Sequence, residues 1–316
     1  MTAPAPPAPL VSKDFLSVLD LTGAELDTLL DLARTMKRDR AAGRPLTTAL
    51  AGKHVALLFE KPSLRTRITF VIAVRELGGE VIEPPPDVIF GGRETVEDVA
   101  RNLERWVEGV VVRTYAQSRL NAFAAAAARL HVVNALTNEE HPCQALADMM
   151  TLQERIGSLV GRTLTYVGDG NNVAASLAHA GSMLGLQMRF AAPPGFELPA
   201  RVLQACARVA RHGSTITVTN DPLAAVEGAD AIYTDVWASM GQEQEAASRA
   251  RVFQPFQVNR DLMRAAAPHA TFMHCLPAHR GIEVTDEVMD SPASCVFDQA
   301  ENRLHTQKAL LVLLMG

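Results

Sequence analysis

The chain has 316 residues, a length that favours two domains of about 150 residues each over a single compact one. Its net charge is −5 and it has no run of basic residues, so a nucleic-acid-binding surface is not expected. No apolar run approaches the roughly 18 residues that cross a membrane. The Pro-rich residues 1–10 lack the regions of a secretion signal and predict a disordered head. The four cysteines lack CxxC spacing, so reduced thiols in a cytoplasmic protein are expected.

The first half of the chain alternates between helical and strand-like patterns. Residues 13–43 contain two amphipathic segments, and Thr22 with Glu25 three residues later forms a capping box at the start of the second. Four apolar runs follow, the first three of them each preceding a helical pattern: HVALLF (54–59), GEVIEP (79–84), GVVVRTY (109–115) and HVVNAL (131–136). Strand–helix alternation of this kind predicts a parallel sheet flanked by helices.

The second half repeats this alternation after a long helical pattern from His141 to Gly157. Its strand-like runs are LTYVGDG (164–170), LQMRFAAP (186–193), STITVT (214–219), ADAIYTDV (229–236) and TFMHCL (271–276), with SCVFDQ (294–299) expected as a final strand before a C-terminal helix. We therefore predict an α/β chain of two domains, each a parallel sheet flanked by helices. The predicted domains are residues 11–145, joined by the helix over 300–316, and residues 146–299.

Polar clusters follow the strand-like runs in both halves of the chain. They are residues 61–67, 113 and 141–144 in the first half, and residues 168–172, 235–241 and 274–281 in the second. Ligands of open parallel sheets bind outside the carboxyl ends of the strands. We therefore expect the active site in a cleft between the two halves, with three clusters from each.

The stretch FEKPSLRTRITF (59–70) places hydroxyls and arginines where a buried strand ends and a helix is expected to begin. A helix N-terminus offers unpaired N–H groups and partial positive charge, so it binds anions readily. Ser63 and Thr66 add hydroxyl donors, and Arg65 adds a bidentate fork that matches phosphate. Arg67 points to a different side of the helix and is expected to support the site. The alternative is a solvated helix start with surface arginines.

Five motifs carry a resemblance to a known family: SLRTR, HPCQALAD, DVWASMGQE, HCLPAHRG and DQAENR. They occur in this order in the transcarbamylases, and the full set resembles the ornithine carbamoyltransferases over nearly the whole chain. The resemblance implies that the first domain binds carbamoyl phosphate and the second binds ornithine. The residues that match the carbamoyl phosphate site are Ser63, Leu64, Arg65, Thr66, Arg67, Arg113, His141, Gln144, Cys275, Leu276 and Arg303. Those that match the ornithine site are Asn172, Asp235, Ser239 and Met240.

The resemblance implies transfer of the carbamoyl group from carbamoyl phosphate to the δ-amine of ornithine, which yields citrulline and phosphate. The expected catalytic residues are Arg113, His141, Asp235 and Cys275. Fixed arginine charges suit a departing phosphate, and His141 can donate a hydrogen bond to the carbonyl oxygen. The δ-amine is mostly protonated at neutral pH, so the site must provide its neutral form, for which Asp235 and Cys275 are the candidates.

The identity of the amine acceptor depends on the segment DVWASMG (235–241). It favours ornithine, because Asp235 can pair with a free α-ammonium group while Ser239 and Met240 complete that end of the site. The alternative is a transcarbamylase that uses another amine: putrescine, N-acetylornithine or aspartate. A catalytically silent relative is expected to have lost Arg65, Arg113, His141 or Asp235, and all of these are present.

The same motifs allow other interpretations. His141 precedes Pro142 and could simply cap a helix. A Cys–His dyad of His274 and Cys275 is disfavoured, because adjacent residues of an extended segment point in opposite directions. A metal site built from His141, Cys143, His274, Cys275 and His279 matches no usual zinc spacing.

A dinucleotide site is suggested only by GDGNN (168–172), which lacks the third glycine and the downstream acid of a nicotinamide site. Asn171 and Asn172 instead offer amides that suit an amino acid. No metal or organic cofactor is implied. Cys206 and Cys295 are expected in the core.

The loop before Glu94 departs from the family pattern. The transcarbamylases usually carry a Gln or His there, and that side chain reaches the carbamoyl phosphate of a neighbouring subunit. Residues Asp87, Val88, Ile89 and Phe90 include neither. The resemblance otherwise implies a homotrimer or an assembly of trimers, in which carbamoyl phosphate binds first. Arginine synthesis and breakdown use the same chemistry, so the direction of metabolism is left open.

Overall fold

The computed structural model describes residues 8–44, 47–85, 92–238 and 243–316. The chain divides into two compact units, which we call unit 1 (residues up to Leu146 together with Asn302–Gly316) and unit 2 (Ala147–Glu301). The division falls within two helices, α6 (Pro142–Ile156) and α13 (Val296–Met315). Each unit contains one parallel sheet, which confirms the predicted two-domain α/β class.

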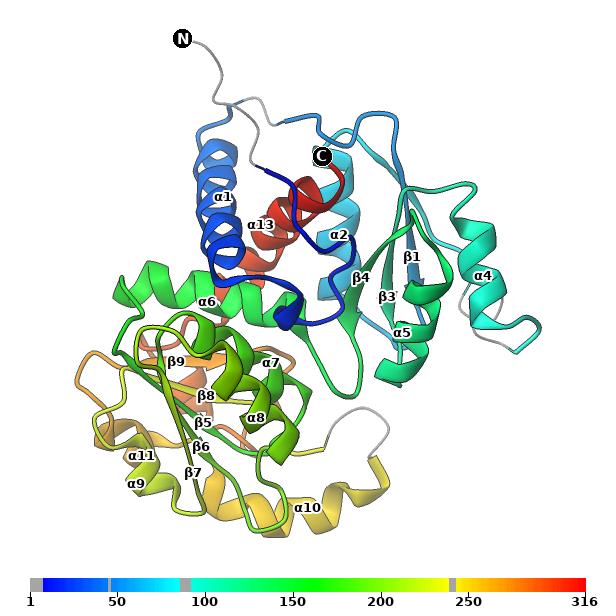
Figure 1. Ribbon diagram of the computed structural model, residues 1–316. Helices are drawn as coiled ribbons and strands as arrows, with labels where there is room; N and C mark the ends of the chain where they lie inside the picture. The colour runs from blue at the N-terminus through cyan, green and yellow to red at the C-terminus, as the bar shows by residue number, and fades with distance from the viewer. Residues whose placement is uncertain (1–7, 45–46, 86–91, 239–242) are drawn as a thin grey trace. The chain divides into compact units, whose positions relative to one another are not determined.

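The sheet of unit 1 has the strand order β2-β1-β3-β4. Its strands are β1 (His54–Phe59), β2 (Glu80–Ile82), β3 (Gly109–Arg113) and β4 (His131–Leu136), and all pairings are parallel. The side chains of β3 are buried along the whole strand, as expected when helices cover both faces of a parallel sheet. Figure 1 shows α4 (Val96–Leu103) and α5 (Gln117–Ala126) on one side of this sheet and α2 (Arg65–Glu76) with α13 on the other.

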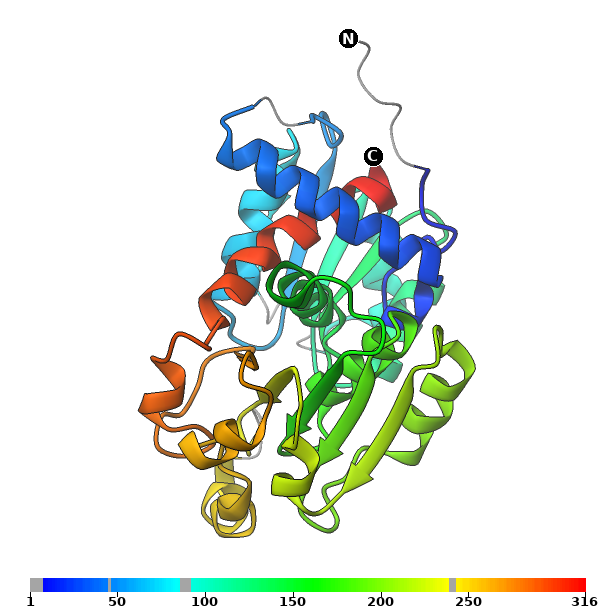
Figure 2. The same ribbon diagram turned by 90° about the vertical axis from the view of Figure 1, so that its left-hand side faces the viewer.

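The long helix α1 (Gly23–Ala41) begins at the predicted capping box. The Thr22 hydroxyl accepts from the backbone N–H of Glu25 (3.2 Å), and the Glu25 carboxylate accepts from the backbone N–H of Thr22 (2.7 Å). Figure 2 shows α1 in blue running beside α13 in red. Lys37 of α1 donates to the side chain of Asn302 in α13 (2.8 Å), which ties the C-terminal helix to this unit.

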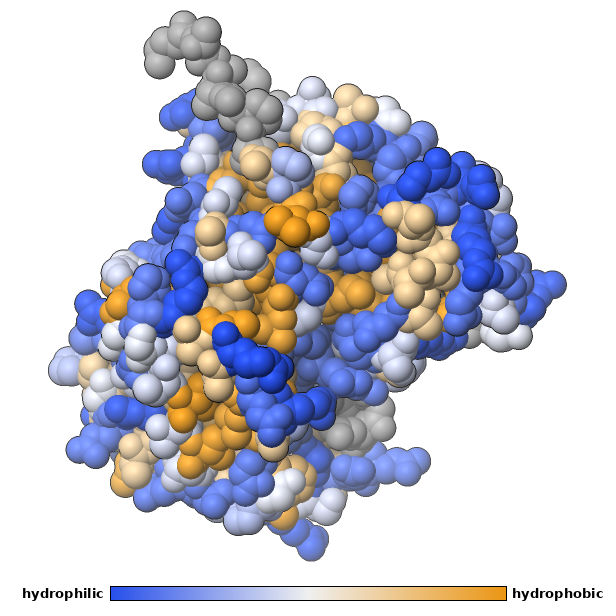
Figure 3. All heavy atoms as spheres, viewed as in Figure 1, coloured by the Kyte–Doolittle hydropathy of each residue, from blue (hydrophilic) through white to orange (hydrophobic). Residues whose placement is uncertain are grey.

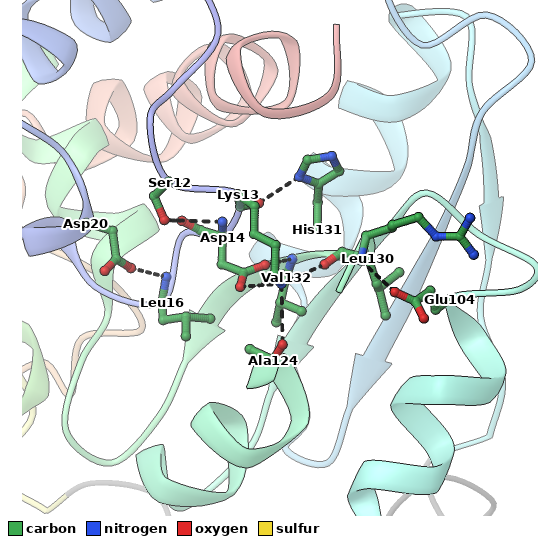
Figure 4. A network of polar contacts seen from close by, with 11 residues as sticks. Ser12, Lys13, Asp14, Leu16, Asp20, Glu104, Ala124, Leu130, His131 and Val132 are labelled. Carbon is green, nitrogen blue, oxygen red and sulfur yellow. Dashed lines mark hydrogen bonds and ion pairs between the residues drawn. The ribbon is translucent and has the colours of Figure 1, made fainter. Parts of the chain in front are cut away.

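The first predicted amphipathic segment is not a regular helix. It contains only a 3₁₀ turn (η1, Val18–Asp20), and the residues before it lie along β4. The backbone N–H of Phe15 donates to Val132 (2.8 Å), and the Asp14 carboxylate accepts from the N–H of Val132 (2.8 Å), as Figure 4 shows in part. Main-chain pairing with an otherwise open sheet edge outweighs the helical pattern, because it satisfies edge N–H and C=O groups.

The sheet of unit 2 has the order β7-β6-β5-β8-β9, and all its pairings are parallel. Its strands are β5 (Thr163–Val167), β6 (Gln187–Ala191), β7 (Thr215–Thr219), β8 (Ala231–Thr234) and β9 (Thr271–His274). The helices are α7 (Asn172–Met183), α8 (Ala200–Val209), α9 (Pro222–Val226), α10 (Ala246–Phe253), α11 (Arg260–Ala265) and α12 (Asp286–Met289), with 3₁₀ turns η2 (Glu243–Glu245) and η3 (Gln254–Phe256). One core joins Ile232 and Phe272 of the sheet to Val226, Leu262 and Val288 of the helices.

The expected final strand over residues 294–299 is wrong. Ser294 makes a single bridge with Phe272, and α13 begins directly afterwards at Val296. The sequence from Val296 onward contains no glycine or proline until Gly316, so the helix extends back through residues that have strand-like composition. A short apolar run is compatible with the buried start of a helix as well as with a strand, so its composition does not distinguish the two.

Hydrophilic side chains cover much of the face shown in Figure 3, with hydrophobic patches between them. Among the described residues, no helix has the length and apolar content needed to cross a membrane. All four cysteines are free thiols, and Cys206 and Cys295 are buried as predicted.

The buried part of α13 predicts a pH-dependent stability. Burial, together with the charges of Lys308, Lys37 and Arg40, lowers the pKa of His305 to about 4. Below pH 6.5 the unfolded chain takes up a proton that folded His305 does not, so stability is lost as pH falls. We expect His305→Gln to reduce the loss in unfolding free energy between pH 7 and pH 5 by about 2 kcal/mol. Urea unfolding at the two pH values measures this.

The control for this experiment is His54→Gln, which alters an exposed side chain at the start of β1. It is expected to lose the same stability as the unaltered protein between the two pH values. Equal pH dependence of the His305→Gln variant and the control would contradict the assignment to His305.

Candidate active site

The strand order brings the predicted clusters of each unit together. In unit 1 the clusters follow β1, β3 and β4, which are neighbours in the sheet. In unit 2 they follow β5, β8 and β9, which are also neighbours. Because parallel strands end at the same edge, each sheet presents three clusters side by side at its carboxyl edge. We call these the unit 1 cluster and the unit 2 cluster.

Arg303 holds the centre of the unit 1 cluster. Its guanidinium donates to the Thr66 hydroxyl (2.6 Å) and to the Gln144 side-chain oxygen (2.7 Å), and these three side chains are buried. Thr66 lies in the first turn of α2, Gln144 in the first turn of α6, and Arg303 in α13. The fork geometry of the guanidinium therefore fixes two helix N-termini relative to each other within the unit.

Arg113 and His141 complete the buried part of the unit 1 cluster. Arg113 ends β3, and His141 directly precedes α6, where its backbone oxygen accepts from the N–H of Gln144 (3.1 Å). His141 thus stands at the cap position, as the alternative interpretation required, but its ring is buried among cations. Burial and the charges of Arg303, Arg113, Arg65 and Lys61 lower the pKa of His141 well below its ordinary value. The ring is therefore neutral at physiological pH.

The other predicted residues of this cluster lie at the start of α2. Ser63 and Arg65 are half-buried, whereas Leu64 is 69% exposed. Arg67 points away from the buried arginines, because it forms an ion pair with Glu83 (3.3 Å) and lies over the Phe59 ring. Arg67 thus points to a different side of α2, as its spacing predicts.

Asp235 is the focus of the unit 2 cluster, directly after β8. One carboxylate oxygen accepts from the Cys275 thiol (3.0 Å), and the other accepts from the Asn171 amide (2.8 Å). The Asn171 side-chain oxygen in turn accepts from the backbone N–H groups of Val173 and Ala174 at the start of α7. The predicted residue Asn172 is the first residue of that helix. Sequence reasoning thus missed the orienting role of Asn171, although its N-cap position was a usable signal.

His274 faces a different partner from Cys275. Its Nδ1 accepts from the backbone N–H of Leu276 (2.9 Å), so Nε2 carries the proton and donates to Glu283 (3.1 Å). Glu283 also accepts from the backbone N–H of His279 (2.6 Å). This buried pair holds the turn that carries Cys275 and Leu276, and the hydrogen bonds of the His274 ring go to Glu283 and to the Leu276 backbone.

An ion pair between Arg249 and Asp169 supports the segment after β8. Arg249 of α10 binds the Asp169 carboxylate and the backbone oxygen of Trp237, and it lies over the Phe196 ring. Burial and the charge of Asp235 raise the pKa of Asp169 to about 6, although Arg249 opposes this shift. Burial also raises the pKa of Tyr166, whose hydroxyl donates to Asn171 (3.3 Å).

Six positions that the sequence singled out cannot be placed in these clusters. Ser239 and Met240, expected to bind ornithine, lie outside the described residues, and so do residues 87–90 of the departing loop.

The local structure of unit 2 explains why glycine occupies positions 168 and 170 of the GDGNN turn. A Cβ atom at Gly170 would lie 2.6 Å from the backbone of Glu197 and Leu198, so this glycine is needed for close packing within unit 2. Gly168 adopts φ 142°, which favours glycine. The GDGNN turn is therefore explained without a dinucleotide, and the nicotinamide interpretation loses its only motif.

The side chains near Asp235 also bear on the metal alternative. Asp235, His274 and Cys275 each place one potential ligand atom within 4.8 Å of the others. Both ring nitrogens of His274 are engaged by Leu276 and Glu283, so the group is not arranged to bind a metal ion. Cys143 and His141 belong to unit 1 and are not among these three residues.

Comparisons with known proteins agree with the motifs. Residues 13–154 match the carbamoyl-P binding domain, and residues 160–314 match the Asp/Orn binding domain, of the aspartate/ornithine carbamoyltransferase family. An ornithine carbamoyltransferase from Parafrankia sp. is 50% identical over 308 residues, which is 97% of each chain.

Solved structures show the same similarity. The ornithine carbamoyltransferase from Pyrococcus furiosus is 46% identical, with a TM-score of 0.94 over 98% of this chain and 99% of that one. The enzyme from Thermus thermophilus is 44% identical, with a TM-score of 0.87 over 97% of this chain and 100% of that one. The chain therefore belongs to the aspartate/ornithine carbamoyltransferase family.

Proposed function

We propose that this chain is an ornithine carbamoyltransferase, which transfers the carbamoyl group of carbamoyl phosphate to the δ-amine of L-ornithine and releases citrulline and phosphate. The observation that carries the proposal is the unit 1 cluster. There Arg303 is already oriented by Thr66 and Gln144, and a neutral His141 lies among buried arginines. Prearranged charge of this kind stabilises negative charge that develops on a departing phosphate without further reorganisation.

The unit 1 residues suit an acyl phosphate in a specific way. Arg65, Arg113 and Arg303 bind the phosphate, and Ser63 and the start of α2 add hydrogen-bond donors, with Leu64 through its backbone and Arg67 in support. The neutral ring of His141 donates to the carbonyl oxygen without competing for the phosphate charge. Gln144 holds the carbamoyl amide. No covalent intermediate is required, because positioning the two substrates supplies much of the rate enhancement.

The unit 2 residues suit a diamino acid. Asp235 is the anion that pairs with a free α-ammonium group, and Asn171 fixes its orientation. Asn172, with Ser239 and Met240, completes the amino acid site. Cys275 and Leu276 meet the attacking amine, and we propose that Asp235 and Cys275 favour its neutral form. An acetylated α-amine carries no positive charge, and putrescine lacks the α-amino acid group, so neither pairs with this carboxylate in the same way. The carboxylate therefore favours ornithine over N-acetylornithine and putrescine.

Citrulline formation from carbamoyl phosphate and ornithine tests the function directly. Parallel reactions contain aspartate, putrescine or N-acetylornithine in place of ornithine. We expect turnover with ornithine alone. Turnover with another amine would retain the carbamoyl phosphate site but refute the role of Asp235 as an α-ammonium partner. Failure with all four amines would favour a catalytically silent relative.

Arg65→Ala is the matched test of the anion site. The substitution removes a bidentate hydrogen-bond donor, and we expect kcat/KM for carbamoyl phosphate to fall about a hundredfold. The Arg75→Ala variant, at the opposite end of the same helix, is the control and is expected to keep full activity. Equal activity of the two variants would contradict an anion site at the start of α2 and would favour the alternative of a solvated helix start.

We further propose that the active protein is a cytoplasmic homotrimer or an assembly of trimers. Leu64, Ile68 and Ile82 are large apolar side chains that are 42–69% exposed on α2 and the edge strand β2, which pack against each other. An apolar group of this kind at a sheet edge suits a contact with a second copy. Sedimentation equilibrium tests this, and a monomer at micromolar concentration would contradict it.

A further inference from the structure

Asp148 is a carboxylate of α6 that none of the preceding assignments uses. It belongs to unit 2 and is fully buried. One of its carboxylate oxygens accepts from the Tyr233 hydroxyl (3.1 Å), and the other accepts from the side-chain NH₂ group of Gln299 (2.9 Å). Tyr233 lies in β8 and Gln299 in α13. A carboxylate that is removed from water needs such donors, so Asp148 holds both side chains firmly.

Gln299 connects Asp148 to the end of β9. Its side-chain oxygen accepts from the backbone N–H of His274 (3.0 Å), which is the last residue of β9 and directly precedes Cys275. A backbone N–H can only donate, so the oxygen of Gln299 must face His274 and its NH₂ group must face Asp148. The direction of each hydrogen bond between β9 and Asp148 is therefore fixed.

Tyr233 connects Asp148 to the end of β8, because it lies two residues before Asp235. Burial and the charge of Asp148 raise the pKa of Tyr233 well above its ordinary value, so the hydroxyl remains a donor. The Tyr233 ring also stacks on the Tyr166 ring, with 5.8 Å between their centres. The Tyr166 hydroxyl donates to Asn171, which orients Asp235.

Asp148 thus joins the carboxyl ends of two neighbouring strands. Asp235 follows β8 and Cys275 follows β9, and the thiol donates to that carboxylate (3.0 Å). We propose that Asp148 is a positioning residue for the ornithine site, where it holds Asp235 and Cys275 in register. The inference rests on the proposed function, because that function assigns these two residues to ornithine and its amine. Asp148 is not a catalytic residue, since it acts only through its two donors.

Asp148→Asn keeps the shape of the side chain but disturbs its pairing. The asparagine oxygen can accept from only one of the two donors, and the NH₂ group must face the other. We expect kcat/KM for ornithine to fall about thirtyfold, mainly through a higher KM. The affinity for phosphonoacetamide, a phosphonate analogue of carbamoyl phosphate that cannot transfer a carbamoyl group, should stay within about twofold in calorimetry, because the phosphate-binding arginines lie in unit 1.

Combining Asp148→Asn with Gln299→Glu exchanges the two side-chain groups and restores the hydrogen bonds. The new glutamate accepts from the backbone N–H of His274 and from the new asparagine, whose oxygen accepts from the Tyr233 hydroxyl. We expect this double variant to recover kcat/KM for ornithine to within about fivefold of the unaltered protein. Gln299→Glu alone places two carboxylates against each other, so it should lose as much activity as Asp148→Asn.

A second readout needs neither substrate nor turnover. All four cysteines lie in the described part of the chain, and only Cys275 among them is not buried, so iodoacetamide should modify it first. The thiolate is the form that reacts, and the hydrogen bond to Asp235 holds the thiol proton. We expect Asp148→Asn to raise the alkylation rate at pH 8 about fivefold, and the double variant to restore the rate of the unaltered protein. Mass spectrometry identifies the modified residue.

Asp230→Asn is the matched control, because Asp230 is another buried carboxylate of the same sheet. It precedes β8 at the opposite end of the strand, where it accepts from the backbone N–H of Thr163 (2.8 Å) and from Arg162 (3.1 Å). We expect this variant to lower the unfolding temperature while the KM for ornithine and the alkylation rate stay unchanged. Equal effects of the two asparagine variants on KM would assign Asp148 to general stability alone.

Two results would overturn the proposal. One is a KM for ornithine in Asp148→Asn within about threefold of the unaltered protein, and the other is a double variant that recovers nothing over the single ones. If Asp148→Asn does not fold, Tyr233→Phe decides, because it removes one donor, and an unchanged KM and alkylation rate would refute the role. A protein that forms no citrulline would refute the proposed function, whereas the alkylation rates would still test the position of Cys275.

Discussion

Replacing Arg303 by alanine is expected to lower kcat/KM for carbamoyl phosphate by about a thousandfold, the largest loss among single substitutions in unit 1. The side chain is buried, and it donates to Thr66 and Gln144 at distances of 2.6 and 2.7 Å. Its loss removes a charge from the phosphate site. It also frees Thr66, a hydroxyl donor expected at that site, and Gln144, which is proposed to hold the carbamoyl amide. Steady-state citrulline assays with varied carbamoyl phosphate measure the effect.

Two further variants separate charge from geometry at this position. Arg303→Lys retains the charge but not the planar fork, so we expect it to recover only part of the activity. Arg101→Ala removes an exposed arginine of α4 and is the control, with activity unchanged. Added guanidinium ions should partly restore Arg303→Ala but not Arg101→Ala. Activity of Arg303→Ala within about tenfold of the unaltered protein would contradict a role at the phosphate.

Replacing Asp235 by asparagine is expected to lower kcat/KM for ornithine by about a thousandfold while the affinity for phosphonoacetamide stays the same. Asparagine has nearly the same shape as aspartate, so the loss reports the charge. The carboxylate is held in place by Asn171 and Cys275 before any substrate binds. A substrate ammonium group therefore meets an oriented partner at little entropic cost.

The role of Asp235 is resolved by a second substrate, 5-aminopentanoate, which is ornithine without its α-ammonium group. If Asp235 pairs with that group, the unaltered protein prefers ornithine to 5-aminopentanoate, and this preference is smaller in Asp235→Asn. Comparing both proteins with both substrates gives the coupling energy between Asp235 and the α-ammonium group. If Asp235 instead acts on the δ-amine, both substrates lose activity equally. Asp98→Asn, at an exposed position of α4, serves as the control.

Local patterns in the sequence predicted much of the architecture. Each strand in the described part of the chain overlaps a run that alternation and composition identified, and α1 begins at the Thr22–Glu25 capping box. These features depend on residues within a few positions of one another, so a single sequence contains them. The two wrong elements, the first amphipathic segment and the expected strand over residues 294–299, are short apolar segments whose form depends on a distant strand.

The sequence by itself determined the chemistry of the two clusters, because arginines, a histidine and an aspartate follow strand-like runs in motifs of recognisable spacing. Only the tertiary structure decided which of these residues meet. Arg303 contacts Thr66 across 237 residues of sequence, and Asn171 orients Asp235. Lys61 gains its partner Asn138 only because β1 pairs with β3 and β3 with β4. Such contacts depend on strand order and on the return of the C-terminal helix, and no short stretch of sequence encodes either.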